Sequence, residues 1–178
     1  LDADLSGPLS EKVRGRAVVA YDKSESYLDR HEDESKIAYG ILEFDLSAST
    51  LLTVGHSYDN SHSDGVLWGA LPLLYTDGTR TNYDVSTSNA PDWTFADNIQ
   101  HQTFVELEQK LGSDWTLNAN FFRNKSNYES ELFYVYGTPD PDTELGLNGL
   151  ASAYEREENL DNADLFLSGS FTLGEQTH

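Results

Sequence analysis

The sequence of 178 residues contains no cysteine and no methionine. The lack of cysteine excludes disulfide bonds and thiolate metal sites, and it leaves the compartment open. No apolar run approaches the ~20 residues that a membrane-spanning helix needs, a length that does not apply to the alternating strands of a barrel. No basic and apolar leader precedes Leu1, so we expect a signal peptide to be absent or removed, and the chain to begin inside a strand of a longer polypeptide.

Basic residues are also scarce. The chain has 11 Lys and Arg against 31 Asp and Glu, which gives a formal net charge of −20. A nucleic-acid partner is therefore not expected, because contacts to phosphates need a basic surface. Aromatic residues make up 12% of the chain, which is too many for a disordered acidic tail.

Apolar and polar residues alternate with a period of two along much of the chain, which predicts strands. The alternation is clearest at 115–124 and 162–173. Such lengths suit membrane-spanning strands of ~9–11 residues better than soluble strands, which usually have about five or six. We expect no helix in these regions, although the long loops could hold short ones. The expected strands are 1–6, 13–28, 36–46, 51–59, 101–111, 115–124 and 162–173.

The connections between these strands alternate in length. Tight links are expected at 10–12, 47–50 and 112–114, and long polar loops at about 29–35, 60–100 and 138–159. Short turns at one end and long loops at the other are typical of transmembrane β-barrels. We interpret the acidic runs at 29–35 and 155–158 as solvated loop tips. The predicted fold is all-β, an antiparallel up-and-down meander.

The polar faces of the expected strands carry full charges, which indicates either a wide water-filled or plugged barrel interior or the solvent face of a soluble sheet. In a meander, Asp2 and Asp4 could pair with Arg14 and Arg16 across neighbouring strands. Aromatic residues gather near strand ends, as in a membrane-interface girdle, although strands favour aromatics in any case. The girdle candidates are Tyr21, Tyr27, Tyr58, Trp115, Tyr128 and Phe171.

No catalytic or metal site is predicted. His56 falls on an apolar face, which favours a structural role near an interface. His62 lies in Ser61-His62-Ser63-Asp64, but adjacency in sequence does not create a catalytic triad. The chain has no G-x-S-x-G elbow and no EF-hand spacing, and its acidic residues are too numerous to single out an acid–base pair.

Several segments, taken in order, carry a family resemblance: 5–9 (LSGPL) with 14–16 (RGR), 39–46 (YGILEFDL), 51–55 (LLTVG), 67–81 (LWGALPLLYTDGTRT) and 92–93 (DW). Together they resemble the barrel of TonB-dependent ferric-siderophore receptors, especially those for hydroxamate siderophores such as coprogen, ferrichrome-type compounds and pyoverdine. The resemblance covers most of 1–137 and weakens afterwards.

The resemblance implies a receptor in the outer membrane of a Gram-negative bacterium, with a 22-stranded transmembrane barrel plugged by an N-terminal domain. Such a receptor imports a ferric siderophore with energy passed through TonB. This chain shows no plug domain, no TonB-contacting segment and too few strands to close a barrel. We therefore interpret all of 1–178 as a partial barrel domain, about the first third of the strands, which would not transport alone.

The resemblance also suggests what the loops bind. Oxygens of the siderophore itself ligate the iron, so no protein metal ligand and no cofactor are expected. The loop at 60–100 is long and aromatic, which favours function over disorder. Trp68, Tyr75, Tyr83 and Trp93 are candidates to stack on the chelate, and Arg80 is a candidate to meet an anionic group on it.

Two other interpretations stay open: a soluble secreted β-sandwich or adhesin module that binds sugar or calcium, and a barrel enzyme. The barrel interpretation places Leu117, Leu165 and Leu167 against outer-membrane lipid, and finding them sealed in a dry core would contradict it. An open sheet has two unpaired edges and an exposed apolar face. We therefore expect the chain to self-associate, with its edges paired between copies.

Overall fold

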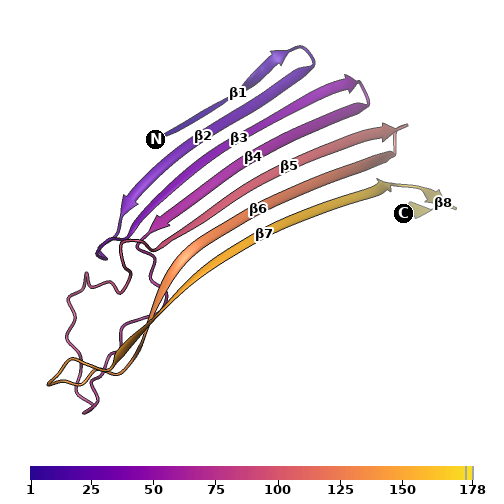
Figure 1. Ribbon diagram of the computed structural model, residues 1–178. Helices are drawn as coiled ribbons and strands as arrows, with labels where there is room; N and C mark the ends of the chain where they lie inside the picture. Colours follow the sequence, from indigo (N-terminus) through magenta and orange to yellow (C-terminus); the bar gives the residue numbers. More distant parts are fainter. Residues whose placement is uncertain (175, 178) are drawn as a thin grey trace.

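The computed structural model describes residues 1–174 and 176–177, and these form strands, turns and loops without any helix. Within that part of the chain, no helix is long and apolar enough to cross a membrane. Seven long strands lie side by side in one curved sheet (Figure 1). The strands are β1 (Asp2–Ser10), β2 (Val13–Glu25), β3 (Glu32–Ser47), β4 (Thr50–Asp64), β5 (Phe95–Leu111), β6 (Trp115–Gly137) and β7 (Leu147–Gly169).

Each strand pairs antiparallel with the next along the chain, in the order β1 to β7. The predicted up-and-down meander of seven strands is confirmed. The tight turns at 11–12, 48–49 and 112–114 all lie at one end, here called the turn end. The long loops at 26–31, 65–94 and 138–146 lie at the other, here called the loop end. After β7 the chain forms a small hairpin of β8 (Thr172–Leu173) and β9 (Gln176–Thr177), so the strand expected at 162–173 is divided.

The strands run further into the loop end than the alternation predicts. β6 and β7 pair without interruption from Trp115 and Gly169 up to Gly137 and Leu147. The loop expected at 138–159 therefore spans only 138–146, and the one expected at 60–100 spans 65–94. The acidic run 155–158 lies in β7, and most of 29–35 lies in the 26–31 turn and β3. Polar residues occupy both faces of 125–131 and 155–159, so these parts lack alternation, but backbone pairing needs no apolar side chain.

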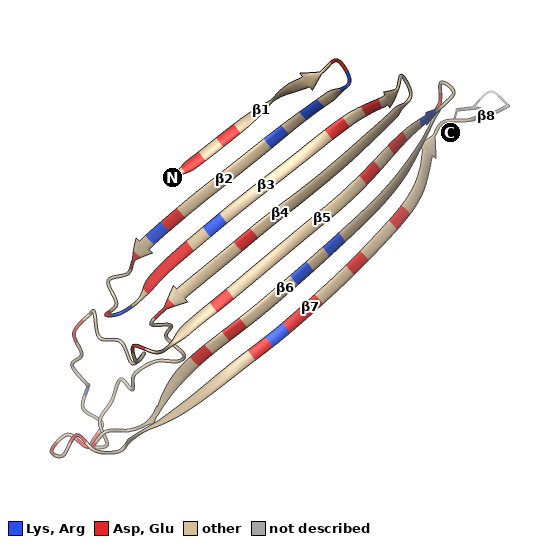
Figure 2. Cartoon of the chain, turned by 45° about the horizontal axis from the view of Figure 1, so that its top comes forward, with Lys and Arg blue, Asp and Glu red and all other residues tan. Residues whose placement is uncertain are grey.

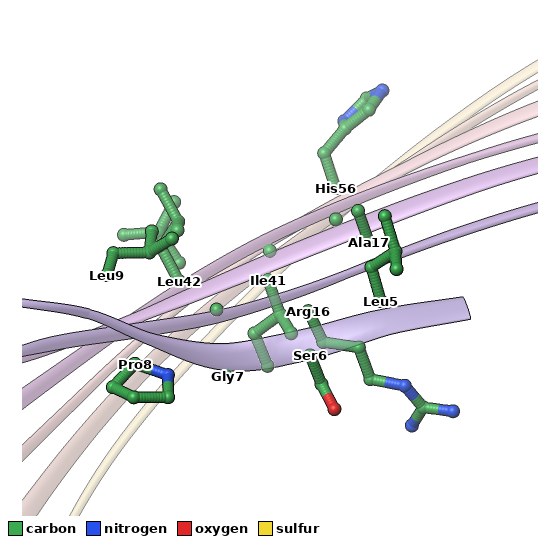
Figure 3. Close-up of a pocket in the computed structure, with 14 residues that line it drawn as sticks. Leu5, Ser6, Gly7, Pro8, Leu9, Arg16, Ala17, Ile41, Leu42 and His56 are labelled. Carbon is green, nitrogen blue, oxygen red and sulfur yellow. The ribbon is translucent and has the colours of Figure 1, made fainter. Parts of the chain in front are cut away.

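The register sorts every strand residue onto one of two faces, because residues directly opposite each other in an antiparallel pair point to the same side. We call outer face the one with Leu5, Ala17, Gly40 and His56, which pair in that order across β1 to β4. The inner face is the opposite one, which carries Asp4 and its neighbours at even positions of β1 and β2. Figure 3 shows Leu9, Leu42 and His56 on one side of the ribbons and Ser6, Pro8 and Arg16 on the other.

The outer face is apolar near the turn end and polar near the loop end. Its leucines are not covered by other residues: Leu165 is 70% exposed and Leu167 is 53% exposed. In the described part of the chain, the only hydrophobic residues that are buried are Ala90 and Leu132. A dry core between two layers is therefore not present there, which rules out the β-sandwich. The apolar band of the outer face includes Leu5, Leu9, Val19, Leu42, Phe44, Leu52, Val54, Val105, Leu107, Phe121, Leu165 and Leu167.

The border of this apolar band crosses the strands obliquely. From the turn end, the apolar band ends at Tyr21 on β2, Tyr58 on β4 and Phe121 on β6, and Phe133 and Val135 lie separately, near the tip of β6. In the register, Tyr21 is in line with Asn60 on β4 and Asn127 on β6. Neighbouring residues on one face are two positions apart, which we call one same-face step. Relative to Tyr21, the border is therefore one step nearer the turn end at β4 and three steps nearer at β6. With ~6.6 Å per step and ~4.8 Å between strands, the border falls ~20 Å over ~19 Å, an angle of about 45°. Strands of membrane barrels tilt by a similar angle.

The inner face carries cross-strand ion pairs near the turn end. Arg16 binds Asp4 at 2.6 Å, as the sequence predicts. Arg14 does not pair with Asp2; it binds Glu43 at 2.5 Å and Asp45 at 2.8 Å on β3. These basic residues are the blue bands of β2 near the turn end in Figure 2, where acidic residues are spread over all seven strands. The inner face is therefore polar and acidic, and local ion pairs compensate Arg14 and Arg16.

The aromatic girdle is confirmed only in part. Tyr21 and Tyr58 lie on the outer face at the upper border of the apolar band. Trp115 lies on the outer face at the turn end, where its ring stacks on Phe171 at 6.4 Å between centroids. Tyr128 points to the inner face instead, under the guanidinium of Arg156 at 6.0 Å. Its even position on β6 puts it among Phe122, Asn124 and Ser126, so an interface role for Tyr128 is wrong.

An arginine on the outer face tests the lipid-facing assignment. We expect Leu165→Arg to lower the free energy of unfolding by about 2–4 kcal/mol in phospholipid vesicles, because the charge would enter hydrocarbon. Asn118→Arg, on the inner face, should cost well under half of that. Denaturant titration of both variants measures the difference, and equal costs would show that the outer face meets water.

Candidate functional site

The β6–β7 hairpin reaches far past the apolar band and forms one wall of the loop end. On β6, the residues from Lys125 to Gly137 lie beyond the apolar band. At ~3.3 Å per residue, this extension measures about 40 Å. The 65–94 loop lies beside it, and Figure 1 shows that loop between the β2–β3 turn and the tip of the hairpin. The three long connections therefore form one unit.

Arg30 fastens the 26–31 turn to the 65–94 loop. Its side chain donates a hydrogen bond of 2.8 Å to the carbonyl of Ala90 and one of 2.9 Å to the carbonyl of Ser88. Asp29 adds a backbone bond of 2.7 Å to Ser86. Arg30 holds a positive φ of 67°, a conformation that non-glycine residues adopt only where their surroundings impose it. These contacts hold the second half of the 65–94 loop against the 26–31 turn.

The other half of the loop is fastened to the hairpin tip. Residues 73–81 form a tight hairpin, in which Tyr75 donates to the carbonyl of Thr79 at 2.8 Å. Thr76 then donates to the carbonyl of Pro139 at 2.9 Å in the 138–146 loop. There, the backbone N–H and the hydroxyl of Thr143 hold the pKa of Asp140 below its usual value. The 65–94 loop thus bridges two neighbouring loops.

An aromatic cluster forms where the first part of this loop crosses the hairpin. The ring of Trp68 meets Tyr134 at 5.8 Å and Tyr154 at 5.6 Å, both edge to face. Tyr134 stacks on Tyr136 at 6.3 Å. Gly69 lets the chain pass, since it has a φ of +101° and a Cβ there would lie 2.3 Å from the Tyr134 ring. All three tyrosines are on the inner face, so the cluster faces the polar interior.

Sequence reasoning singled out Trp68 but missed Tyr134, Tyr136 and Tyr154. Tyr134 and Tyr136 stand two residues apart, which is a strand signal that the expected end of the strand at 124 concealed. The face of each tyrosine follows from the register of β6 and β7. Their contact with Trp68 depends on the course of the 65–94 loop, which no alternation of apolar and polar residues predicts.

The five predicted ligand-binding residues do not form one cluster. Trp93 packs edge to face on Phe133 at 6.0 Å. Phe133 and Tyr134 are consecutive strand residues, so Trp93 and Trp68 lie on opposite faces of the hairpin. The other three are on the loop surface: Tyr75 and Arg80 belong to the 73–81 hairpin, and Tyr83 follows it and is 38% exposed.

His62 belongs to a charged row on the outer face beyond the apolar band. Its Nδ1 lies 2.6 Å from Asp97 and its Nε2 lies 3.2 Å from Asp64. Burial lowers the pKa of His62, but the hydrogen bond and charge of Asp97, with the charge of Asp64, raise it more, so the net pKa is above its ordinary value. Ser61 and Ser63 point to the inner face, so no serine faces this histidine.

A hollow of about 650 Å³ lies away from the loop end, over β1 to β4, where the side chains that line it on the outer face are apolar apart from His56 (Figure 3). Among the residues that the structure describes, no group of three or more His, Asp and Glu could hold a metal ion. The loop end is therefore an aromatic and polar surface without a metal centre in its described residues.

Comparison with characterised proteins gives close sequence matches over nearly the whole chain. The chain is 37% identical over 177 residues to the ferric-pyoverdine BN7/BN8 receptor of Pseudomonas putida, a match covering 98% of this chain and 22% of that protein. It is 33% identical over 181 residues to the ferripyoverdine receptor of Pseudomonas aeruginosa, covering 99% and 22%. The chain thus spans about a fifth of the length of these relatives. No protein-family model matches the sequence.

Solved structures agree with these matches. The crystal structure of the outer-membrane ferripyoverdine receptor of P. aeruginosa bound to ferripyoverdine has a TM-score of 0.90 at 32% identity, covering 99% of this chain and 24% of that one. The ferric-catecholate import receptor Fiu of E. coli K12 has a TM-score of 0.77 at 13% identity, covering 96% and 26%. The second likeness shows the shared fold alone.

Removing the Arg30 side chain should loosen the loop that it holds. We expect Arg30→Ala to speed amide hydrogen exchange in 86–94 by about fivefold to thirtyfold, because loss of these bonds costs ~1–2 kcal/mol of local stability. Arg80→Ala is the matched control, since the Arg80 guanidinium has no hydrogen bond or ion pair in the described part of the chain. If exchange in 86–94 were the same in both variants, Arg30 would not hold the loop.

The charged row at His62 should respond to pH. Because its folded pKa is raised, His62 stabilises the row below its ordinary pKa of about 6.5, and this contribution is lost as the pH rises through the folded value. Asp97→Asn should lower the pKa of His62, measured by NMR titration of the labelled ring. Ser61→Ala, on the opposite face, should leave the titration unchanged, and an Asp97→Asn titration identical to the parent's would refute the pairing.

Proposed function

We propose that this chain, which belongs to the TonB-dependent ferric-siderophore receptors, is the part of such a receptor that gathers a ferric siderophore at the cell surface. The chain lies in the outer membrane, with the apolar band of its outer face against lipid. Its loop end faces the outside and its turn end the periplasm, as in other barrels of this kind. The observation that carries the proposal is the aromatic cluster at the loop end of the inner face.

The proposed ligand is a ferric pyoverdine-type siderophore, because the two relatives are named as receptors for ligands of this class. Iron enters as cargo, ligated by the oxygens of the siderophore, so the protein supplies neither a metal ligand nor a cofactor. What a receptor needs is an aromatic surface with a few polar donors. The faces of Trp68, Tyr134 and Tyr154 meet that need on the inner side of the hairpin.

The predicted residues take different roles in this proposal. Trp68 stacks on the chelate, together with Tyr134 and Tyr154. Arg80 and Tyr83 lie on the exposed loop surface and Tyr75 is half-buried beside them. There, the guanidinium of Arg80, which has no partner among the described residues, meets an anionic group of the siderophore. Trp93 faces the other side of the hairpin against Phe133. Trp93 therefore supports the loop and makes a smaller contribution to binding.

Transport belongs to the whole receptor. We propose that import uses energy delivered by the TonB complex through a plug domain inside a 22-stranded barrel, to which this chain contributes seven strands. The names of the relatives describe receptors, and the proposal includes no enzymatic step. Pairing of edge strands between copies of the chain is not needed in this account, because neighbouring barrel strands would cover β1 and β7.

Binding of ferric pyoverdine to the full-length receptor tests this assignment. We expect Trp68→Ala and Tyr154→Ala each to weaken binding by about tenfold to a hundredfold, since each removes ~1.5–3 kcal/mol of aromatic contact. Quenching of tryptophan fluorescence on titration gives the affinity. Trp93→Ala should weaken binding less than Trp68→Ala.

The matched control is Trp115→Ala, which removes the same side chain at the turn end. It should bind as the unchanged receptor does. If Trp68→Ala and Tyr154→Ala also bound with unchanged affinity, the cluster would not be the site.

A further inference from the structure

The hollow on the outer face exists because glycines replace side chains there. Gly7 pairs with Gly15 across β1 and β2, and Gly40 lies one same-face step further on β3. A Cβ at Gly7 or Gly40 would find no atom within 4 Å, so the space above them is open. The walls are Leu5, Leu9, Leu42 and Val54.

This hollow runs up the membrane rather than along a strand. Because the apolar border crosses the strands at about 45°, the line perpendicular to it rises by roughly 0.7 of a same-face step for each strand that it crosses toward β7. From Gly15 the line rises one step to Gly40 and passes to His56, which is directly opposite Gly40 at the edge of the hollow (Figure 3). It then rises one more step to His101, whose ring lies 5.7 Å from that of His56.

The same line ends at a lysine. Lys125 is directly opposite His101 in the register, with Asn159 on its other side. Lys125 makes no ion pair within 4 Å with any residue that the structure describes, although its charge acts on the nearby Asp161. Two carboxylates near it on β7 have other partners. Asp161 holds Arg123 at 2.6 Å, and Glu157 accepts a hydrogen bond of 3.3 Å from Asn159.

We propose that the line of outer-face residues from the hollow to Lys125 binds one anionic, phosphate-bearing lipid of the outer leaflet. An acyl chain lies in the hollow above the glycines, and the phosphate lies at Lys125 and His101. Charge complementarity supports that occupant. The chain has a net charge of −20, yet an unpaired lysine and a histidine stand together on the outer face beside the apolar border. This is the depth at which lipid phosphates meet a membrane protein.

Apolar complementarity supports the same occupant. The hollow opens on a face that meets hydrocarbon, and its side-chain walls on that face are aliphatic apart from His56 at its edge. A flexible acyl chain can lie along the bottom of the hollow, from Gly7 to Gly40, between the leucine side chains that form its walls. The lipid site uses the outer face, so it is independent of siderophore binding at the inner face.

Lipid binding to the full-length receptor in detergent tests the proposal, with native mass spectrometry as the readout. The probes are dipalmitoyl phosphatidic acid, which is anionic, and dipalmitoyl phosphatidylcholine, which has the same chains and no net charge. We expect phosphatidic acid to bind more tightly. Lys125→Gln should weaken its binding about fivefold, from ~1 kcal/mol per cation near an anionic headgroup, and leave phosphatidylcholine binding unchanged.

Two further variants complete the test. Gly40→Leu places a side chain in the hollow, where its Cβ would meet no atom within 4 Å, so it should weaken binding of both lipids. Lys110→Gln makes the same charge change at the turn end and should alter neither. Equal phosphatidic acid binding by Lys125→Gln and Lys110→Gln would overturn the proposal, as would unchanged binding by Gly40→Leu. Ferric pyoverdine binding should be retained in all three variants, which separates this test from that of the proposed function.

Discussion

The continuous antiparallel backbone ladder is the constraint on which the rest of the structure depends. Hydrocarbon offers no hydrogen bonds, so a segment that crosses a bilayer must pair its backbone groups within the protein. From β1 to β7 the pairing runs from the turn end to the loop end with local shifts only near Pro8 and Asp45. Because the side-chain period is two, this unbroken register keeps lipid-facing and interior residues apart over seven strands.

The same ladder builds the site. It continues past the apolar band in β6 and β7, where it lifts Tyr134 and Tyr154 far above the membrane on the inner face. The loop then reaches these tyrosines with Trp68, while Arg30 and Thr76 fasten it on either side. A stiff hairpin and a loop held at two places give an aromatic surface a fixed position, which lowers the entropy cost of binding.

Alternation in the sequence predicted the fold well where one face meets apolar surroundings. The segment 115–124 assigns Leu117 and Phe121 to one face and Asn118 and Asn120 to the other, as the register confirms. The prediction failed in 125–137 and 147–159. Polar residues occupy both faces of 125–131 and 155–159, while 132–136 has apolar or aromatic residues on both faces, so neither stretch alternates. Tyr128 was misplaced for this reason, because the predicted strand ended at 124.

The site was only partly predictable. The aromatic loop was evident from composition, but Trp68 and Trp93 end on opposite faces of the hairpin, and nothing near either residue in sequence distinguishes them. Arg30 is one cation in an acidic turn, and its partners Ser88 and Ala90 are carbonyls some 60 residues away. Contacts of backbone carbonyls leave no mark on sequence.

The most direct test of the central claim is the membrane depth of spin labels placed at Tyr21, Tyr58 and Phe121 of the full-length receptor. Electron paramagnetic resonance gives each depth from the ratio of collisions with oxygen and with a water-soluble nickel complex. We expect one common depth, close to the headgroups, although these residues occupy three different levels of the register. Depths that followed the register, or labels equally open to nickel at all three positions, would contradict a tilted sheet with its outer face in lipid.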